Sequence, residues 1–255
     1  MIKNLYDYRE LLKSNVKKEI RGKYKGSFLG VLWSFLNPLL QVAVYAIVFP
    51  YIMRIKTENY LQYLIVGIIP WTFFTTVVNQ GMIAVRMNAG IIKKVYFPRE
   101  ILPISVAVSG LVNFFISCII ILLFCIFGGL GISWHLALLP IIAIIQFFFT
   151  LGIVMALSAI NIYVKDTEYL VTFILSMLFY VTPILYSAEL FPEKMRWILQ
   201  INPLSGIITA YRDIFMYHQI PSLNIILYLI GVTILIFFIG LAIFRKLEKG
   251  FAEEV

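Results

Sequence analysis

Six long apolar runs constrain this sequence more than any other feature. They cover residues 28–53, 61–85, 101–127, 136–160, 169–186 and 223–244, and contain no Asp, Glu, Lys, Arg or His. A helix needs about 20 apolar residues to cross the hydrocarbon core of a bilayer. Because backbone polar groups in lipid must be paired within the protein, the runs should be helices. We therefore expect an all-α polytopic membrane protein with six transmembrane helices.

The formal net charge of +8 is distributed along the chain in a way that predicts its topology. With the N-terminus in the cytoplasm, sixteen Lys and Arg residues fall on the cytoplasmic side and five on the outer side. Basic residues accumulate in cytoplasmic loops of membrane proteins. We expect both termini to be cytoplasmic, and we expect no nucleic-acid partner.

Residues 1–26 are predicted to form a basic amphipathic helix ahead of a single permease domain that covers residues 27–255. Apolar side chains recur there at spacings of three or four residues, at Leu5, Tyr8, Leu12, Val16 and Ile20. Lysines occupy much of the remaining surface. Such a helix lies in the membrane interface with its cations on anionic headgroups. Packing on a soluble partner is an alternative that is compatible with the first.

The segment at about 88–98, between the second and third runs, is too short and too basic to span a membrane. It is also too apolar for a simple linker. We interpret it as a short helix that presents Ile91, Ile92, Val95 and Tyr96 to a cytoplasmic partner. A helix lying on the lipid headgroups is the alternative.

The segment at about 188–218, between the fifth and sixth runs, contains two apolar stretches that are too short to cross the membrane. Asn202 followed by Pro203 is typical of a helix start. We expect two short helices that re-enter the outer leaflet, where backbone is tolerated only if protein or water surrounds it. A loop lying flat on the membrane is the alternative.

The six runs lack the groups that many other membrane functions require. Ion-coupled carriers usually place acidic or basic side chains at mid-membrane depth, and an intramembrane enzyme needs a nucleophile with a base, or metal ligands. His135 and His218 fall near the outer edge, and Cys118 and Cys125 are interpreted as packing residues. We expect no catalytic residue and no metal site. The phosphate-binding pattern G-x-x-x-x-G-K-[ST] is also absent from the sequence.

The functional groups that the apolar runs do place at membrane depth are neutral polar and aromatic side chains. The polar ones are Asn37, Gln41, Asn79, Gln80, Asn113 and Gln146. An aromatic ring can stack on the C–H face of a sugar, so a neutral aromatic wall suits a sugar polymer, although it would suit a lipid tail almost as well. The candidate residues of a translocation path are Trp33, Phe35, Tyr45, Trp71, Phe74 and Tyr180.

Four motifs, in residues 21–39, 93–100, 163–169 and 183–204, carry a family resemblance over essentially the whole chain. The first contains Trp-Ser-Phe-Leu-Asn-Pro and the second reads Lys-Lys-Val-Tyr-Phe-Pro-Arg-Glu. The chain resembles the membrane subunit of ABC exporters for cell-surface polysaccharides. That class moves lipid-linked O-antigen, capsule or teichoic-acid chains.

The resemblance implies a homodimer in the bacterial cytoplasmic (inner) membrane, with two copies of a separate ATP-binding subunit beneath it. ATP and Mg²⁺ would bind to that subunit, and no cofactor would bind to this chain. The segment at 88–98 would be the coupling helix, which would contact the ATPase through Asn88, Ile91, Ile92, Lys93, Lys94, Val95, Tyr96 and Phe97. Lys165 and Asp166 would form a cytoplasmic motif, where the family often has Arg-Asp. Trp197, Asn202 and Tyr211 would belong to the outer gate.

We therefore expect a non-catalytic permease subunit of an ATP-driven exporter that moves lipid-linked polysaccharide outward. An ABC-type drug or lipid exporter is an alternative with the same architecture. An ion-coupled secondary carrier is a second alternative and would transport without ATP. A membrane enzyme or an assembly scaffold is a third and would act without an ATPase.

Overall fold

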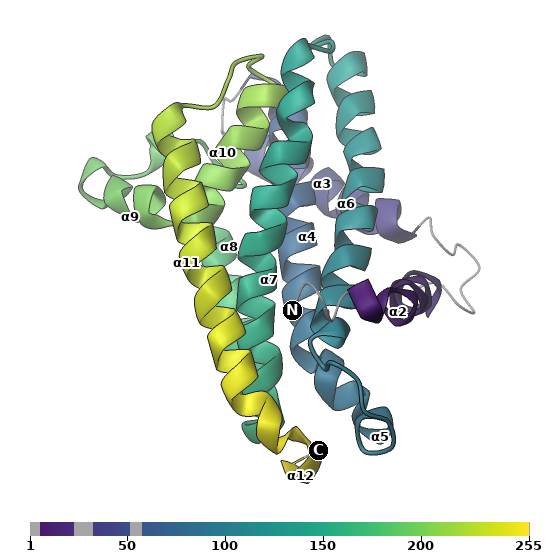
Figure 1. Cartoon of the computed structure of the whole chain (residues 1–255). Helices are drawn as coiled ribbons and strands as arrows, with labels where there is room; N and C mark the ends of the chain where they lie inside the picture. The colour runs from purple at the N-terminus through teal and green to yellow at the C-terminus, as the bar shows by residue number, and fades with distance from the viewer. Residues whose placement is uncertain (1–5, 23–32, 52–57, 255) are drawn as a thin grey trace.

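The computed structural model describes residues 6–22, 33–51 and 58–254 (Figure 1). Helices account for 84% of it, and no strand occurs within those ranges. Each of the six apolar runs contains one helix. These helices are α3 (Trp33–Tyr51), α4 (Tyr60–Met87), α6 (Ile101–Phe127), α7 (Leu139–Tyr163), α8 (Thr167–Val181) and α11 (Leu223–Leu247). The expectation of an all-helical protein is confirmed for the described residues.

Four of the helices are long and apolar enough to cross a membrane. They are α4, α6, α7 together with the preceding 3-10 turn η2 (Trp134–Leu138), and α11 with the following turn η5 (Glu248–Gly250). The apolar parts of α3 and α8 are shorter. The 15 residues of α8 extend about 22 Å at 1.5 Å per residue, against a hydrocarbon core of about 30 Å.

The fifth run was expected to be helical to residue 186, but α8 ends at Val181. The cause is the next proline. Thr182 adopts an extended conformation, with φ −91° and ψ 133°, because a residue before proline disfavours the α region. Residues 182–186 therefore continue as irregular chain.

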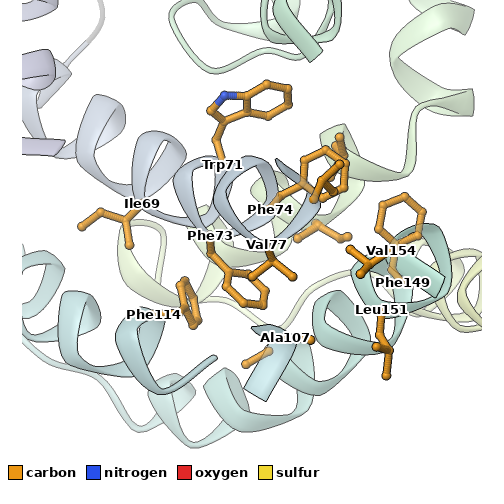
Figure 2. Packing of buried hydrophobic residues seen from close by; sticks show 14 of the residues in the cluster. Ile69, Trp71, Phe73, Phe74, Val77, Ala107, Phe114, Phe149, Leu151 and Val154 are labelled. Carbon is orange, nitrogen blue, oxygen red and sulfur yellow. The ribbon is translucent and has the colours of Figure 1, made fainter. Parts of the chain in front are cut away.

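Helix α4 lies at the centre of the bundle and contacts α3, α6, α7, α8 and α10. In its most apolar stretch 78% of residues are buried, against 22% for α11 at the rim. Aromatic side chains pack on two sides of α4, with Phe73 against Phe114 at 5.3 Å and Phe74 against Phe149 at 6.0 Å between ring centroids (Figure 2). The core is thus built around the second apolar run.

Helices α7 and α11 pack against each other through glycine. A Cβ atom on Gly152 would lie 2.7 Å from the Cα of Phe237, and one on Gly240 would overlap the carbonyl group of Gly152. Small residues let membrane helices approach closely, because van der Waals packing replaces the hydrophobic effect in lipid. This contact holds α11 to a bundle in which it is otherwise mostly exposed.

The short elements lie beside and at the ends of the long helices (Figure 1). Helix α2 (Arg9–Gly22) lies across the direction of the long helices and contacts α6, with Tyr8, Leu11 and Leu12 half-buried against the core. The one-turn helix α5 (Ala89–Ile92) and the C-terminal α12 (Phe251–Glu254) lie at the same end of the bundle.

Two short helices, α9 (Arg196–Ile201) and α10 (Pro203–Phe215), follow the 3-10 turns η3 (Ala188–Leu190) and η4 (Glu193–Met195). Asn202 caps α10 by accepting a hydrogen bond from the backbone N–H of Leu204 at 3.0 Å. Helix α10 contacts α4, α7 and α11 and is largely buried, whereas α9 lies to one side of the bundle. The structure therefore has two helices in this segment, both too short to cross the membrane.

We predict that Gly240→Leu will destabilise the protein, because the new side chain must push α11 away from α7. Overpacking of this kind costs about 1–3 kcal/mol or more. Gly231→Leu on the same helix is the matched control, since no atom lies within 4 Å of its Cβ position. Thermal unfolding of the detergent-solubilised protein measures the difference, and equal midpoints for the two variants would contradict the packing described.

Candidate functional site

One face of α4 carries a row of neutral polar side chains. They are Thr72, Thr75, Thr76, Asn79 and Gln80. The spacing of three and four residues places them on one side of the helix, and all five are at least partly exposed although α4 is the central helix. Polar groups at membrane depth face protein or water rather than lipid. This face is therefore the first candidate for a functional surface.

Thr72, Thr76 and Gln80 of this face line a pocket that is shared with α6. Thr75 and Asn79 line a groove of about 640 Å³ between α3, α4 and α8, which we call the α3–α4–α8 groove. It is lined by Gln41, Tyr45, Trp71, Thr75, Asn79, Thr172, Leu175, Ser176, Phe179 and Tyr180. The described side chains that line it are all neutral, and they combine amides, hydroxyls and aromatic rings. This set can form hydrogen bonds without holding a charged group in place.

Aromatic rings form one wall of the groove. The Phe179 ring lies 5.5 Å from Trp71, 6.0 Å from Tyr45 and 5.5 Å from Tyr180 between centroids. In Figure 2, Trp71 points away from Phe73, and its ring lies 5.8 Å from that of Phe74. Trp71 and Phe179 are buried, so the half-buried Tyr45 and the exposed Tyr180 are the rings that this cluster offers to a ligand. Phe179 was missing from the sequence-based set.

The structure brings together three of the six predicted path residues, namely Tyr45, Trp71 and Tyr180. Phe74 does not line this groove, because its ring packs between Trp71 and Phe149, at 5.8 and 6.0 Å between centroids. Trp33 lies at the start of α3 and is exposed. The side chain of Phe35 lies outside the described part of the structure.

A second groove, of about 1340 Å³, lies on the other side of α8 and is almost entirely apolar. Its α8 residues are Val171, Ile174, Leu175, Leu178 and Val181, and α4, α7, α9, α10 and α11 supply the rest. We call it the apolar groove. Helix α8 thus separates a polar groove from an apolar one, with Leu175 lining both.

The segment at 88–98 is only partly the helix that was expected. Helix α5 covers four residues, and turns follow it. Ile91, Val95 and Tyr96 are 49%, 58% and 91% exposed, but Ile92 and Phe97 are buried at 6% and 7%. Ile92 and Phe97 belong to the core and anchor the segment to it, so their contact with a partner stays a prediction. Met87 joins the exposed apolar set.

The polar residues of this segment point outward or toward α2. Lys93 and Lys94 are exposed. Asn88 donates to the Ala84 carbonyl at 2.8 Å and accepts from the Lys18 ammonium at 3.4 Å. The N-terminal helix and the predicted coupling segment are thereby in contact.

The C-terminal residues lie against the end of the same segment. Arg99 donates to the carbonyl oxygen of Glu248, and its guanidinium lies 5.7 Å from the centroid of the Phe251 ring. The two sequence-distant segments form one surface at this end of the bundle.

Lys165 and Asp166 are exposed in the turn between α7 and α8. The ion pair at this position is instead formed by Arg86 at the end of α4 and Glu168 in the first turn of α8. Asn161 also donates to the Glu168 carboxylate, at 3.1 Å. This ion pair was not predicted. The sequence signal that was available is the acidic residue in the first turn of a helix, a position where negative charge is stabilising.

The three predicted outer-gate residues do not share one surface. Trp197 is exposed on α9, whereas Tyr211 is fully buried. The Tyr211 hydroxyl donates to Gln146 at 2.9 Å, and Gln146 donates to the Pro70 carbonyl at 2.8 Å. Tyr211 packs inward because α10 places this face against α4 and α7.

Asn202 has a structural role, since its side chain caps α10 and donates to the Thr182 hydroxyl at 2.9 Å. Arg212 and Asp213, both buried in α10, were not predicted as site residues. Within the described ranges, no group of three His, Cys, Asp or Glu side chains could hold a metal ion.

Comparisons with known proteins identify a family for this arrangement. Residues 10–216 match the model of the ABC-2 type transporter. The chain is similar to the O-antigen export system permease protein RfbA of Myxococcus xanthus, at 35% identity over 100% of this chain and 99% of the relative. It is similar to RfbA of Klebsiella pneumoniae, at 38% identity over 96% and 94%, and to the polysialic acid transport protein KpsM of Escherichia coli, at 23% identity over 91% and 92%. The chain belongs to the ABC-2 type transporter family.

Proposed function

We propose that this chain is the transmembrane subunit of an ATP-driven exporter that moves a lipid-linked polysaccharide from the cytoplasmic to the outer face of the inner membrane. The observation that carries the proposal is the neutral α3–α4–α8 groove, with its polar face and aromatic wall. The names of the relatives, O-antigen export permease and polysialic acid transport protein, support the same cargo class.

The chemistry of the groove suits a sugar polymer. Amide and hydroxyl groups can exchange hydrogen bonds with sugar hydroxyls, and the rings of Tyr45 and Tyr180 can stack on sugar faces. A charged side chain in the path would hold the polymer at one position, because charge-assisted hydrogen bonds are about twice as strong as neutral ones. A neutral wall lets successive residues of the polymer replace one another.

A homodimer is the assembly that we propose, with α3 and α8 at its interface. In a single subunit the groove is open, which would leave Thr75 and Asn79 of α4 toward lipid. Apolar side chains flank the opening on both helices, and the exposed ones include Leu40, Val44 and Ile47 on α3 and Phe173 and Met177 on α8. A second copy would cover them and enclose the path. In this assembly α3 and α8 complete a set of six spans per subunit.

The end of the bundle that carries α5 and α12 is proposed to face the cytoplasm and two copies of an ATP-binding subunit. Exposed apolar side chains of Ile91, Val95 and Tyr96 lie there beside the cations of Lys93 and Lys94. ATP and Mg²⁺ would bind to the partner. The buried Ile92 and Phe97 would transmit its movement into the core.

Export of a lipid or an apolar drug is the second candidate, and the apolar groove is the observation that favours it. An assay of surface glycan and of drug resistance in a deletion strain separates the two. Loss of surface glycan with unchanged resistance supports the proposed cargo.

We predict that Tyr45→Ala and Tyr180→Ala will each reduce glycan export about 2- to 10-fold, because an aromatic contact contributes roughly 0.5–1.5 kcal/mol. Surface glycan is measured in whole cells at matched membrane levels of the protein. Phe238→Ala, which removes an exposed ring on α11, is the control and should export normally. Normal export by the double variant Tyr45→Ala/Tyr180→Ala would exclude the groove as the path.

We predict that Lys93→Glu/Tyr96→Ala will abolish co-purification of the chain with its ATP-binding subunit, because the variant reverses a charge and removes the most exposed aromatic ring of the contact. Lys194→Glu/Tyr217→Ala makes the same two changes in the segment between α8 and α11, on exposed residues, and should leave the complex intact. If the wild-type chain never co-purifies with an ATP-binding subunit, the exporter proposal is contradicted and an ion-coupled carrier is favoured.

A further inference from the structure

The irregular chain after α8 is buried. Thr182, Pro183, Ile184 and Leu185 are all inside the protein, and the turn continues to Tyr186. We call residues 182–186 the α8 turn. Backbone carbonyls that leave a helix at membrane depth need new donors, since neither lipid nor apolar side chains supply any. The identity of those donors determines what the end of α8 is attached to.

Four consecutive carbonyls of the α8 turn each accept a hydrogen bond from a side chain. The Arg212 guanidinium donates to Pro183 at 2.7 Å and to Ile184 at 3.1 Å. The Tyr60 hydroxyl donates to Leu185 at 2.8 Å, and the Tyr63 hydroxyl donates to Tyr186 at 2.7 Å. The donors come from α4 and α10. The α8 turn is therefore held by two helices that are distant from it in sequence.

Arg212 is the centre of this arrangement. Arg212 is only 4% exposed. Its guanidinium also donates to the Tyr63 carbonyl at 3.4 Å and lies 3.4 Å from the centroid of the Tyr63 ring. Among the described residues no carboxylate forms an ion pair with it. Asp213, its neighbour, instead accepts a hydrogen bond from Gln219 at 2.7 Å. Carbonyl dipoles and a ring face therefore compensate the desolvated charge.

The position requires arginine rather than any cation. A planar guanidinium can donate to several carbonyls while stacking on a ring, whereas an ammonium is a point charge on a flexible stem. The opposite helix is adapted to it. A Cβ atom on Gly67 of α4 would lie 3.0 Å from the Arg212 Nη2 atom and 3.3 Å from the Ile184 side chain. Glycine at this position leaves the space that the guanidinium occupies.

Helix α8 is the element that this contact controls. Grooves flank it on both sides, so its attachment to the bundle depends strongly on its two ends. At one end Glu168 is paired with Arg86 of α4, and at the other Arg212 holds the α8 turn to α4 and α10. Movement of α8 is therefore passed through Arg212 to the short helices that precede α11.

We propose that Arg212 is a positioning residue for transport, which joins the end of α8 to α4 and α10 so that displacement of α8 opens the outer segment. The inference rests on the proposed exporter function. It assigns to Arg212 no contact with the cargo. Its loss should therefore separate ATP hydrolysis from export rather than abolish both.

The test uses the full complex with its ATP-binding subunit and compares wild type with Arg212→Lys. We expect the variant to assemble and to hydrolyse ATP at a rate within about twofold of wild type. Glycan exported per ATP hydrolysed should fall at least about tenfold, which is the effect of losing one charge-assisted hydrogen bond of roughly 1.5 kcal/mol or more. Arg196→Lys is the matched control, because Arg196 is exposed and donates to the carbonyls of Phe191 and Glu189.

A second readout distinguishes positioning from general stability. Leu185→Cys places a thiol in the α8 turn, in a background with Cys118 and Cys125 replaced by alanine. Its alkylation by a membrane-permeant maleimide should stay slow in the otherwise wild-type complex. With Arg212→Lys it should become fast only during ATP turnover. Fast alkylation without ATP would indicate a merely loosened fold and would overturn the proposal.

Gly67→Ala provides an independent variant that keeps the arginine but crowds its guanidinium. It should reproduce the uncoupling, while Gly231→Ala, which meets open space, should not. A positioning role would be rejected if Arg212→Lys exported as much glycan per ATP hydrolysed as wild type. It would also be rejected if neither Arg212→Lys nor Gly67→Ala assembled into the complex. A wild-type complex without ATPase or glycan export would instead overturn the underlying exporter proposal.

Discussion

A polar group without a partner is costly inside a bilayer, and the need to pair such groups governs this structure. Regular helices pair almost all backbone groups, and the exceptions are met by specific side chains. Buried side chains are paired too, as when Gln146 donates to the Pro70 carbonyl and accepts from the Tyr211 hydroxyl. Where α8 ends, Arg212 and two tyrosines supply the donors that the helix no longer provides. These contacts connect α10 to the core, which explains why a helix too short to span the membrane is nevertheless buried.

The same constraint applies to side chains and gives the groove its significance. The polar face of α4 would be unfavourable toward lipid, so it must border protein, water or cargo. Helix α6 borders the part at Thr72, Thr76 and Gln80, and α3 and α8 border the part at Thr75 and Asn79. Helix α8 has hydroxyls and rings on one face and aliphatic side chains on the other, which matches its position between a polar groove and an apolar one.

Physical connections run from one end of the bundle to the other along α4 and α8. The exposed segment that follows α4 is anchored by Ile92 and Phe97, and Arg86 near the end of α4 is paired with Glu168 of α8. The other end of α8 is bound through its turn to α10. An ATPase that moved the first segment would act through α4 on α8, which has few attachments to the bundle between its two ends. This arrangement is compatible with membership of a family of ATP-driven transporters.

The sequence by itself determined the helical class, the six apolar segments, the cap at Asn202 and the family, because each follows from local composition, spacing or motif. It also supplied five residues of the groove, the aromatic Tyr45, Trp71 and Tyr180 and the polar Gln41 and Asn79. Only the tertiary structure decided that Phe74, Ile92, Phe97 and Tyr211 face the core, since an apolar or aromatic side chain suits protein, lipid or a partner equally well. It also revealed the contacts of Arg212. A single arginine in a short apolar stretch gives no indication of its partners when those partners are backbone carbonyls, which every residue carries and which only the fold brings within reach.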